Sequence, residues 1–180
     1  MKELSLNILD IAENSIAANA SLVEIKVSEL IDDNLLIITI SDNGKGMSED
    51  FLKTVTDPFS TTRTTRKVGM GISLLKLVAE QSNGTFDISS KIGEGTVVKA
   101  VFQRDHIDRP PLGNIEQTIS TLVSCNLNVN FVYEHTFNKR NFIMDTREIA
   151  EALQGVPLNT PDVILWIQSY IREGICDISS

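Results

Sequence analysis

The 180-residue sequence has only two cysteines and no long apolar run, and these absences exclude two classes of protein. Nothing in it approaches the roughly 18 consecutive apolar residues that cross a bilayer, and residues 1–3 lead directly into a mixed polar pattern unlike a secretory signal. Cys125 and Cys176 have neither metal-ligand spacing nor the density of a disulfide framework. We therefore expect a cytoplasmic protein with no membrane partner, in which both thiols are reduced and at least partly buried.

Positive charge is also scarce, because 16 Lys and Arg residues stand against 24 Asp and Glu, for a net charge of −8. The acidity is evenly spread: residues 1–105 carry 11 basic and 15 acidic side chains, and residues 106–180 carry 5 and 9. Binding to a phosphate backbone requires a basic surface, so we expect no nucleic-acid partner. One local basic cluster, Arg63, Arg66 and Lys67, contrasts with this background.

The hydrophobic pattern of the first 105 residues predicts alternating helices and strands. Amphipathic helices are expected over 3–19 and 69–81, and strands over 23–27, 35–40, 85–90 and 95–103. Residues 55–68, rich in Thr and basic side chains, show no periodicity and are predicted to be a loop. This order of elements indicates an α/β domain.

A second, smaller part follows the break at Arg109-Pro110-Pro111. Its predicted elements are helices over 114–124, 146–153 and 161–173 and strands over 129–133 and 141–144. The segment Asp145-Thr146-Arg147-Glu148 has the pattern of a capping box. Thr160-Pro161 predicts a capped helix start, and Gly174 predicts its end. We therefore expect a folded α+β domain over 110–180, after a first domain over residues 1–105.

Single residues of this second part carry their own predictions. Trp166, Tyr170 and Ile171 form an apolar stripe that we expect in the core, with a partner-binding face as the alternative. His135, beside a predicted turn, is expected on the polar surface. His106 begins a segment with a faint likeness to a phosphoacceptor box, but the prolines that follow disfavour a helix there, and we interpret the match as coincidence.

Asp10 and Asn14 form the first candidate site, because residues four apart on a helix project side by side. The Asn14 carboxamide oxygen suits a magnesium ion that is otherwise ligated by water and phosphate. Asp10, one turn away, suits the orientation or deprotonation of a nucleophile near a γ-phosphate. Solvated polar positions on an amphipathic helix are the ordinary alternative for both.

Glycine-bearing segments form the remaining candidates. Asp42-Asn43-Gly44-Lys45-Gly46 places a carboxylate at a strand end, where it can accept a hydrogen bond from an adenine amino group. Gly69 and Gly71 open a helix just after Arg63 and Lys67, which suits a triphosphate. The last is the turn Gly93-Glu94-Gly95-Thr96. Taken singly, each matches an ordinary turn or helix start.

In this order and spacing, the four segments resemble the motifs of the Bergerat-fold (GHKL) ATPases, the family of DNA gyrase, mismatch-repair MutL, heat-shock chaperones and histidine kinases. Residues 57–102 resemble a histidine-kinase catalytic domain, and residues 12–20 the asparagine box of MutL. The resemblance covers about residues 4–104. It implies a two-layer α/β (α+β) sandwich, with a mixed sheet covered by helices on one face, to which the small α+β domain is appended.

The resemblance also implies roles for individual residues. Asn14 would bind Mg²⁺, Asp42 would recognise adenine, and Thr96 would help bind the adenine edge. The remaining nucleotide-binding assignments are the pocket-shaping glycines Gly44, Gly46, Gly69 and Gly71, the lid residues Arg63 and Lys67, and the slot residues Met47 and Leu74. A core role is an equal alternative for Met47 and Leu74.

Two departures from the family pattern bear on activity. Hydrolytic members have glutamate where this chain has Asp10, and the shorter side chain lies about one methylene further from an attacking water. Histidine kinases often have lysine where this chain has Ala17. We expect a Mg²⁺-dependent ATP-binding protein that regulates a partner protein by phosphorylation. An ATP-driven switch with slow hydrolysis and a nucleotide-sensing module are the alternatives.

Overall fold

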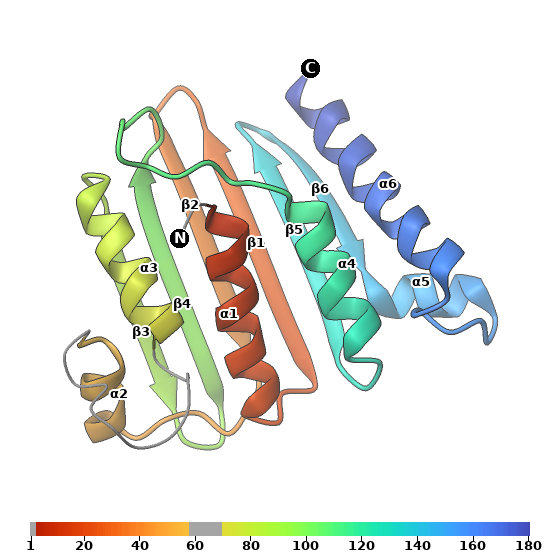
Figure 1. Cartoon of the computed structure of the whole chain (residues 1–180), viewed down its shortest axis with the longest axis horizontal. Coiled ribbons are helices and arrows are strands. Elements are labelled where there is room, and N and C mark those ends of the chain that lie inside the picture. The colour runs from red at the N-terminus through yellow and green to blue at the C-terminus, as the bar shows by residue number, and fades with distance from the viewer. Residues whose placement is uncertain (1–2, 58–69) are drawn as a thin grey trace.

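The structure is a computed structural model and describes residues 3–57 and 70–180 (Figure 1). In chain order its elements are α1 (Leu4–Ala17), β1 (Leu22–Leu30), β2 (Leu35–Asp42), α2 (Glu49–Val55), α3 (Met70–Gln81), β3 (Thr85–Lys91), β4 (Gly95–Gln103), α4 (Ile115–Cys125), β5 (Asn130–Phe137), β6 (Arg140–Asp145), α5 (Thr146–Leu153) and α6 (Pro161–Ser179). In the described part of the chain, no helix combines the length and the apolar character that crossing a membrane requires.

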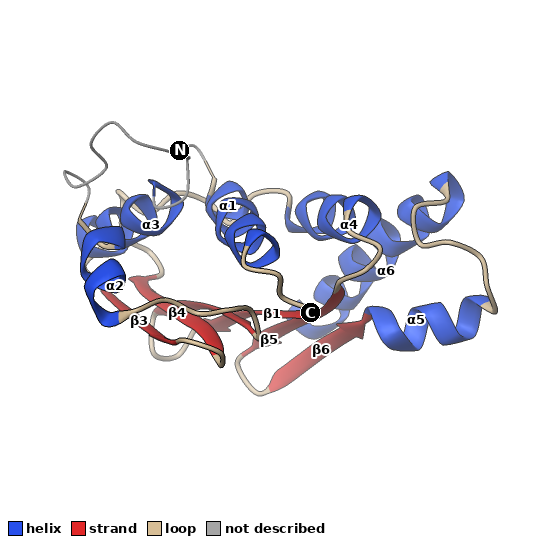
Figure 2. Ribbon diagram, turned by 90° about the horizontal axis from the view of Figure 1, so that it is seen from below, coloured by secondary structure: helices blue, strands red, loops and turns tan. Residues whose placement is uncertain are grey.

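All six strands form one mixed sheet in the order β3-β4-β2-β1-β5-β6. Strands β1 and β5 pair in parallel, and the other four neighbouring pairs are antiparallel. Helices α1, α3 and α4 lie on one side of this sheet (Figure 2). The predicted fold, a mixed sheet with helices on one face, is confirmed.

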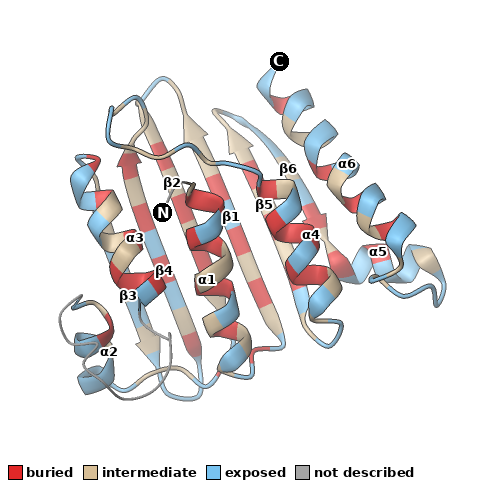
Figure 3. Ribbon diagram, in the orientation of Figure 1, coloured by how far each residue is buried: buried red, intermediate tan, exposed pale blue. Residues whose placement is uncertain are grey.

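The core lies between the sheet and these helices. The central strands alternate buried and accessible residues, so their buried side chains share the face of the sheet that packs against the helices. In β1, Val23, Ile25 and Val27 are fully buried, whereas Lys26 between them is exposed. Buried positions alternate with accessible ones along β1 and β2, and they recur at helical spacing in α1 (Figure 3). The strand and helix periodicities in the sequence thus direct their apolar residues into one shared layer.

The sheet is continuous across the predicted boundary near residue 109. Strand β5 pairs with β1 along eight residues, from Leu22 opposite Asn130 to Glu29 opposite Phe137. Helix α4 packs against both α1 and α6. The division into folding units 1–105 and 110–180 stays a prediction, and in the structure the two segments share one sheet.

Two predictions about helix α6 are wrong. It continues through Gly174 to Ser179, so this glycine does not end the helix. A Cβ atom at Gly174 would lie 2.2 Å from the Phe142 ring, and the glycine therefore allows β6 and α6 to approach closely. Thr160 precedes the helix but does not cap it, because its hydroxyl donates to the Pro157 carbonyl oxygen at 2.7 Å.

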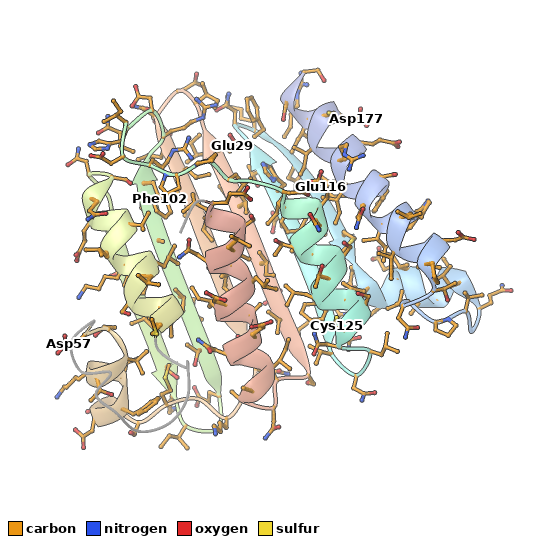
Figure 4. The ribbon with its side chains drawn as sticks, in the orientation of Figure 1. Glu29, Asp57, Phe102, Glu116, Cys125 and Asp177 are labelled. Atoms are coloured by element: carbon orange, nitrogen blue, oxygen red, sulfur yellow. The ribbon has the colours of Figure 1, made fainter. Side chains whose placement is uncertain are left out.

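Other local expectations have mixed outcomes. Asp145 does cap α5, by accepting from the Arg147 N–H at 2.9 Å. Helix α2, capped by Ser48, was not predicted. Cys125, at the end of α4 (Figure 4), and Cys176 are both exposed, so the expectation of buried thiols is wrong. Both lie on helix positions that face solvent.

His135 is fully buried, so its predicted surface position is also wrong. It belongs to a hydrogen-bond network. The Tyr133 hydroxyl lies 2.6 Å from His135 Nδ1, and His135 Nε2 lies 2.9 Å from Glu29 Oε1. Arg104 adds an ion pair, with its Nε atom 3.6 Å from Glu29 Oε2. These polar contacts link β5 to the far end of β1 (Glu29 in Figure 4) and to the segment after β4.

These polar contacts make the free energy of unfolding depend on pH in the acid range. The hydrogen bond from His135, aided by the charge of Arg104, lowers the pKa of Glu29 below its ordinary value of 4.5, although burial opposes the shift. Because the folded pKa is the lower one, the stabilisation is complete above about pH 4.5 and is lost as the pH falls through the folded pKa. We expect Glu29→Gln to lower the free energy of unfolding near neutral pH by about 2 kcal/mol and to flatten its acid dependence.

Urea unfolding between roughly pH 3 and pH 7 measures both effects. The matched control is Glu94→Gln, which removes a carboxylate whose partner, Lys91, lies with it on an exposed turn and is expected to change stability by at most about 0.5 kcal/mol. Equal effects of the two substitutions would contradict the assigned role of Glu29.

Candidate nucleotide site

Asp42, the last residue of β2, is held rigidly by two donors. The Ser15 hydroxyl of α1 donates to its Oδ2 at 2.6 Å, and the Gly44 N–H donates to its Oδ1 at 2.8 Å. Hydrogen bonds to a carboxylate are short and strong. Each carboxylate oxygen has a second lone pair, so the group keeps accepting capacity while its orientation is fixed.

The loop after Asp42 is attached to α1 and to the β3–β4 turn. Lys45 donates its N–H to the Ala18 carbonyl oxygen at 2.9 Å, and its own carbonyl oxygen accepts from the Gly93 N–H at 2.8 Å. Gly46 has a φ of +69°, and a Cβ there would lie 2.0 Å from the Lys91 carbonyl oxygen. This position therefore requires glycine, for both its backbone conformation and the available space.

Thr96 lies directly opposite Asp42 in the β2–β4 register. Its hydroxyl is 2.8 Å from the Ser90 hydroxyl, which also accepts the Met47 N–H at 2.8 Å. Ser90 lies 3.0 Å from the Gly95 carbonyl oxygen as well. Ser90 thus joins Thr96 to Met47, and the strand register places Thr96 opposite Asp42 at this end of the sheet.

Helix α1 brings the other candidates to the same end. Asn14 precedes Ser15, the residue that holds Asp42, and Ala18 touches Gly44, whose Cβ position is 2.8 Å from the Ala18 carbonyl oxygen. The Asn14 Nδ2 atom is buried and has no hydrogen-bond partner among the residues that the structure describes. A buried amide of this kind is costly unless a partner is supplied, and Asn14 therefore suits a ligand.

Asp10 meets the start of α3. A Cβ atom on Gly71 would lie 2.9 Å from the Asp10 Cβ, so α1 and α3 lie close together where α3 begins. Leu74, one turn further along α3, is half-buried, as are Asp10 and Met47. Arg63, Lys67 and Gly69 lie outside the described residues.

Ser15 and Ser90 were missed by sequence reasoning. Ser15 offered a usable signal, since it falls on the buried stripe of α1 with Ile8 and Ile11, where a hydroxyl needs a partner. Ser90 gave no comparable signal, because β3 alternates half-buried and exposed residues along its whole length.

Comparison with known proteins identifies the family to which this geometry belongs by sequence. Residues 1–106 match the family described as histidine kinase-, DNA gyrase B-, and HSP90-like ATPase. Among curated relatives, sporulation kinase E of Bacillus subtilis is 31% identical over 118 residues, which cover 65% of this chain and 14% of that protein. The sensor histidine kinase YxdK of the same organism is 32% identical over 82 residues, which cover 43% of this chain and 25% of that protein.

A solved structure extends the fold comparison. The MutL ATPase domain of Aquifex aeolicus, complexed with ADP, superposes with a TM-score of 0.52 at 15% identity, covering 86% of this chain and 70% of that one. The family match spans more than half of the sequence, and this chain belongs to the histidine kinase-, DNA gyrase B- and HSP90-like ATPase family. It spans no more than a quarter of the two kinases named above.

Proposed function

We propose that this chain binds ATP with Mg²⁺ at the Asp42 end of the sheet and uses it to phosphorylate a partner protein. The carboxylate of Asp42, held on both oxygens by Ser15 and Gly44, is the observation that carries this proposal. An amino group that approaches the remaining lone pairs meets an acceptor that is already oriented, which reduces the entropy lost on binding.

The surroundings of Asp42 suit an adenine ring. The paired hydroxyls of Thr96 and Ser90 offer a polar edge directly across the strand pair. Half-buried Met47 and Leu74 offer apolar surface for the ring faces. A few oriented polar groups beside apolar walls are typical of small-molecule sites.

The chain's own residues also fit a magnesium ion and phosphates. Mg²⁺ prefers oxygen ligands and usually retains several waters, so one protein amide can suffice. The proposal assigns Asn14 Oδ1 to the ion and the unpaired Nδ2–H to a phosphate oxygen, which would satisfy this buried amide. Arg63 and Lys67 are assigned to the phosphates, as the spacing of their motif suggests.

Asp10 is assigned to orient the attacking group. In the transfer step a partner's hydroxyl or imidazole nitrogen forms a bond to the γ-phosphorus, the bond to the β–γ bridging oxygen breaks, and ADP leaves. Asp10 takes the proton when the acceptor is a hydroxyl. The kinase names of the relatives support this class of reaction.

An ATP-operated switch is the second candidate, and the continuity of the sheet favours it. Strand β1 lies between β2, which carries Asp42, and β5 of the C-terminal segment. A ligand that binds two states of the chain with different affinity shifts their populations, and this shared strand connects the site to the C-terminal helices.

Labelling with [γ-³²P]ATP distinguishes the two candidates. For the kinase, we expect wild-type protein with Mg²⁺ to release almost no phosphate alone and to transfer label to a protein when extract is added. For the switch, we expect steady release of inorganic phosphate. In either case Asn14→Ala should lower the measured rate at least 100-fold.

The matched control is Asn128→Ala, which changes an exposed asparagine between α4 and β5 and should leave both readouts unchanged. Equal activity of Asn14→Ala and wild type would contradict the assigned site. Phosphate release without protein labelling would overturn the kinase and leave the switch.

A further inference from the structure

Helices α5 and α6 lie at the opposite side of the molecule from α3 (Figure 1). A groove is lined by residues of both helices and by Asp145 at the end of β6. It has a volume of about 340 Å³, and the residues that line it are Asp145, Glu148, Ile149, Ala152, Leu153, Trp166 and Tyr170. We call it the α5–α6 groove. Two of these seven described residues are acidic, five are apolar or aromatic, and none is Lys or Arg.

Aromatic surface in this groove remains open to solvent. The Trp166 and Tyr170 rings stack at 4.9 Å with an interplanar angle of 9°, and the Phe142 ring meets Tyr170 edge-on at 5.1 Å. Trp166 is 49% exposed and Tyr170 is 36% exposed. The predicted core stripe is therefore only partly correct: Ile171 is fully buried, but both aromatic residues face outward.

The surroundings of the groove are predominantly acidic. Residues 145–180 contain six acidic and two basic side chains, for a net charge of −4. The Arg147 guanidinium binds the Asp145 carboxylate, with Nη2 to Oδ2 at 2.6 Å. Glu148 is exposed and makes no salt bridge to any residue that the structure describes. Glu148 therefore offers a cation an exposed carboxylate in the same groove as the Trp166 and Tyr170 rings.

We propose that the α5–α6 groove docks a basic segment of a partner protein in which Lys or Arg alternates with aliphatic residues. The cationic group pairs with Glu148 and lies against the Trp166 ring, since carboxylates and aromatic faces both attract cations. Aliphatic side chains of the segment cover Ile149 and Leu153 in the groove. A second copy of this chain, offering its own α5–α6 groove, would bring two acidic surfaces together, and charge disfavours it.

Trp166 is the only tryptophan of the chain, so its fluorescence reports on this groove directly. The probe is a capped peptide, Gly-Lys-Leu-Arg-Leu-Lys-Gly, titrated into the full-length protein. We expect a saturable fluorescence change with a dissociation constant below roughly 1 mM. A peptide with Glu at the three basic positions should not bind, and one with Ser at the two Leu positions should bind about tenfold more weakly.

Variants localise the contact. Glu148→Lys should weaken binding of the basic peptide at least tenfold, an effect of about 1.4 kcal/mol. The matched control is Glu173→Lys, which makes the same charge change at an exposed α6 position that does not line the groove, and it should change affinity less than about threefold.

Several results would overturn the proposal. They are the absence of saturable binding up to roughly 5 mM, equal binding of the acidic peptide, and equal loss of affinity in the Glu148 and Glu173 variants. Sedimentation of the protein alone provides the remaining test. A concentration-dependent dimer that changes the Trp166 fluorescence would identify a second copy as the occupant.

Discussion

Asp42→Asn is expected to weaken ATP binding about 100-fold or more. The two carboxylate oxygens now accept from the Gly44 N–H and the Ser15 hydroxyl. If the asparagine oxygen stays with Gly44, the amide NH₂ takes the place of Oδ2. It then presents a donor where the adenine amino group needs an acceptor. The loss of a charged hydrogen bond and the mismatch of two donors together correspond to about 3 kcal/mol.

Calorimetric titration with ATP and Mg²⁺ measures this loss, and circular dichroism verifies that the variant is folded. The matched control is Asp87→Asn, the same chemical change at an exposed position of β3, which should bind ATP like the wild type. A dissociation constant of the Asp42 variant within about threefold of the wild-type value would remove the central role assigned to this carboxylate.

Gly95→Ala is expected to have the largest effect on the fold around the site. Gly95 has a φ of +116°, and a Cβ there would lie 1.9 Å from the Asp42 carbonyl oxygen. The substitution therefore adds backbone strain and pushes β4 away from β2 at the nucleotide end. Each of the two effects costs about 1–3 kcal/mol, so we expect a total loss of about 3 kcal/mol in the free energy of unfolding, and loss of ATP binding.

Gly93→Ala in the same turn separates strain from crowding. Gly93 also has a positive φ, of +81°, but a Cβ there would have no neighbour within 4 Å. We expect it to cost only about 1 kcal/mol and to preserve ATP binding. Denaturant unfolding and titration of both variants test the comparison, and equal stability losses would show that crowding against Asp42 contributes nothing.

The sequence predicted the regular elements well because their patterns are local. The alternation in β1 and β2 and the helical periodicity of α1 and α3 direct apolar residues toward one layer, and the structure confirms these elements. The motif residues Asp42 and Thr96 are far apart in sequence, yet they are direct neighbours across β2 and β4. Family resemblance, rather than local pattern, assigned both residues to one adenine site, and their pairing across the two strands was not predicted.

The failures concern contacts between distant segments. Gly174 was predicted to end a helix, but it lies within α6 at a position where the Phe142 ring leaves no room for a side chain. His135 looked like surface because its partners, Glu29 and Tyr133, are visible only once β5 has joined β1. Single-sequence patterns do not report which strands become neighbours, and these residues derive their environment from that pairing.

The C-terminal segment shows the same limit at the level of the fold. Its helices and strands were predicted one by one with correct types, but β5 and α6 extend to Phe137 and Ser179, beyond their predicted ends at 133 and 173. Their incorporation into the sheet that carries Asp42, through a parallel pair of strands, was not predicted. Parallel pairing requires a long crossover connection, and no local signal specifies which strand lies at its other end.

The wild-type arm of the calorimetric titration tests the central claim most directly. The account predicts saturable binding of one ATP per chain, weakened when Mg²⁺ is removed and weakened about 100-fold by Asp42→Asn. Absence of binding by the folded wild-type protein at millimolar ATP with Mg²⁺ would contradict the assignment of a nucleotide site to this end of the sheet.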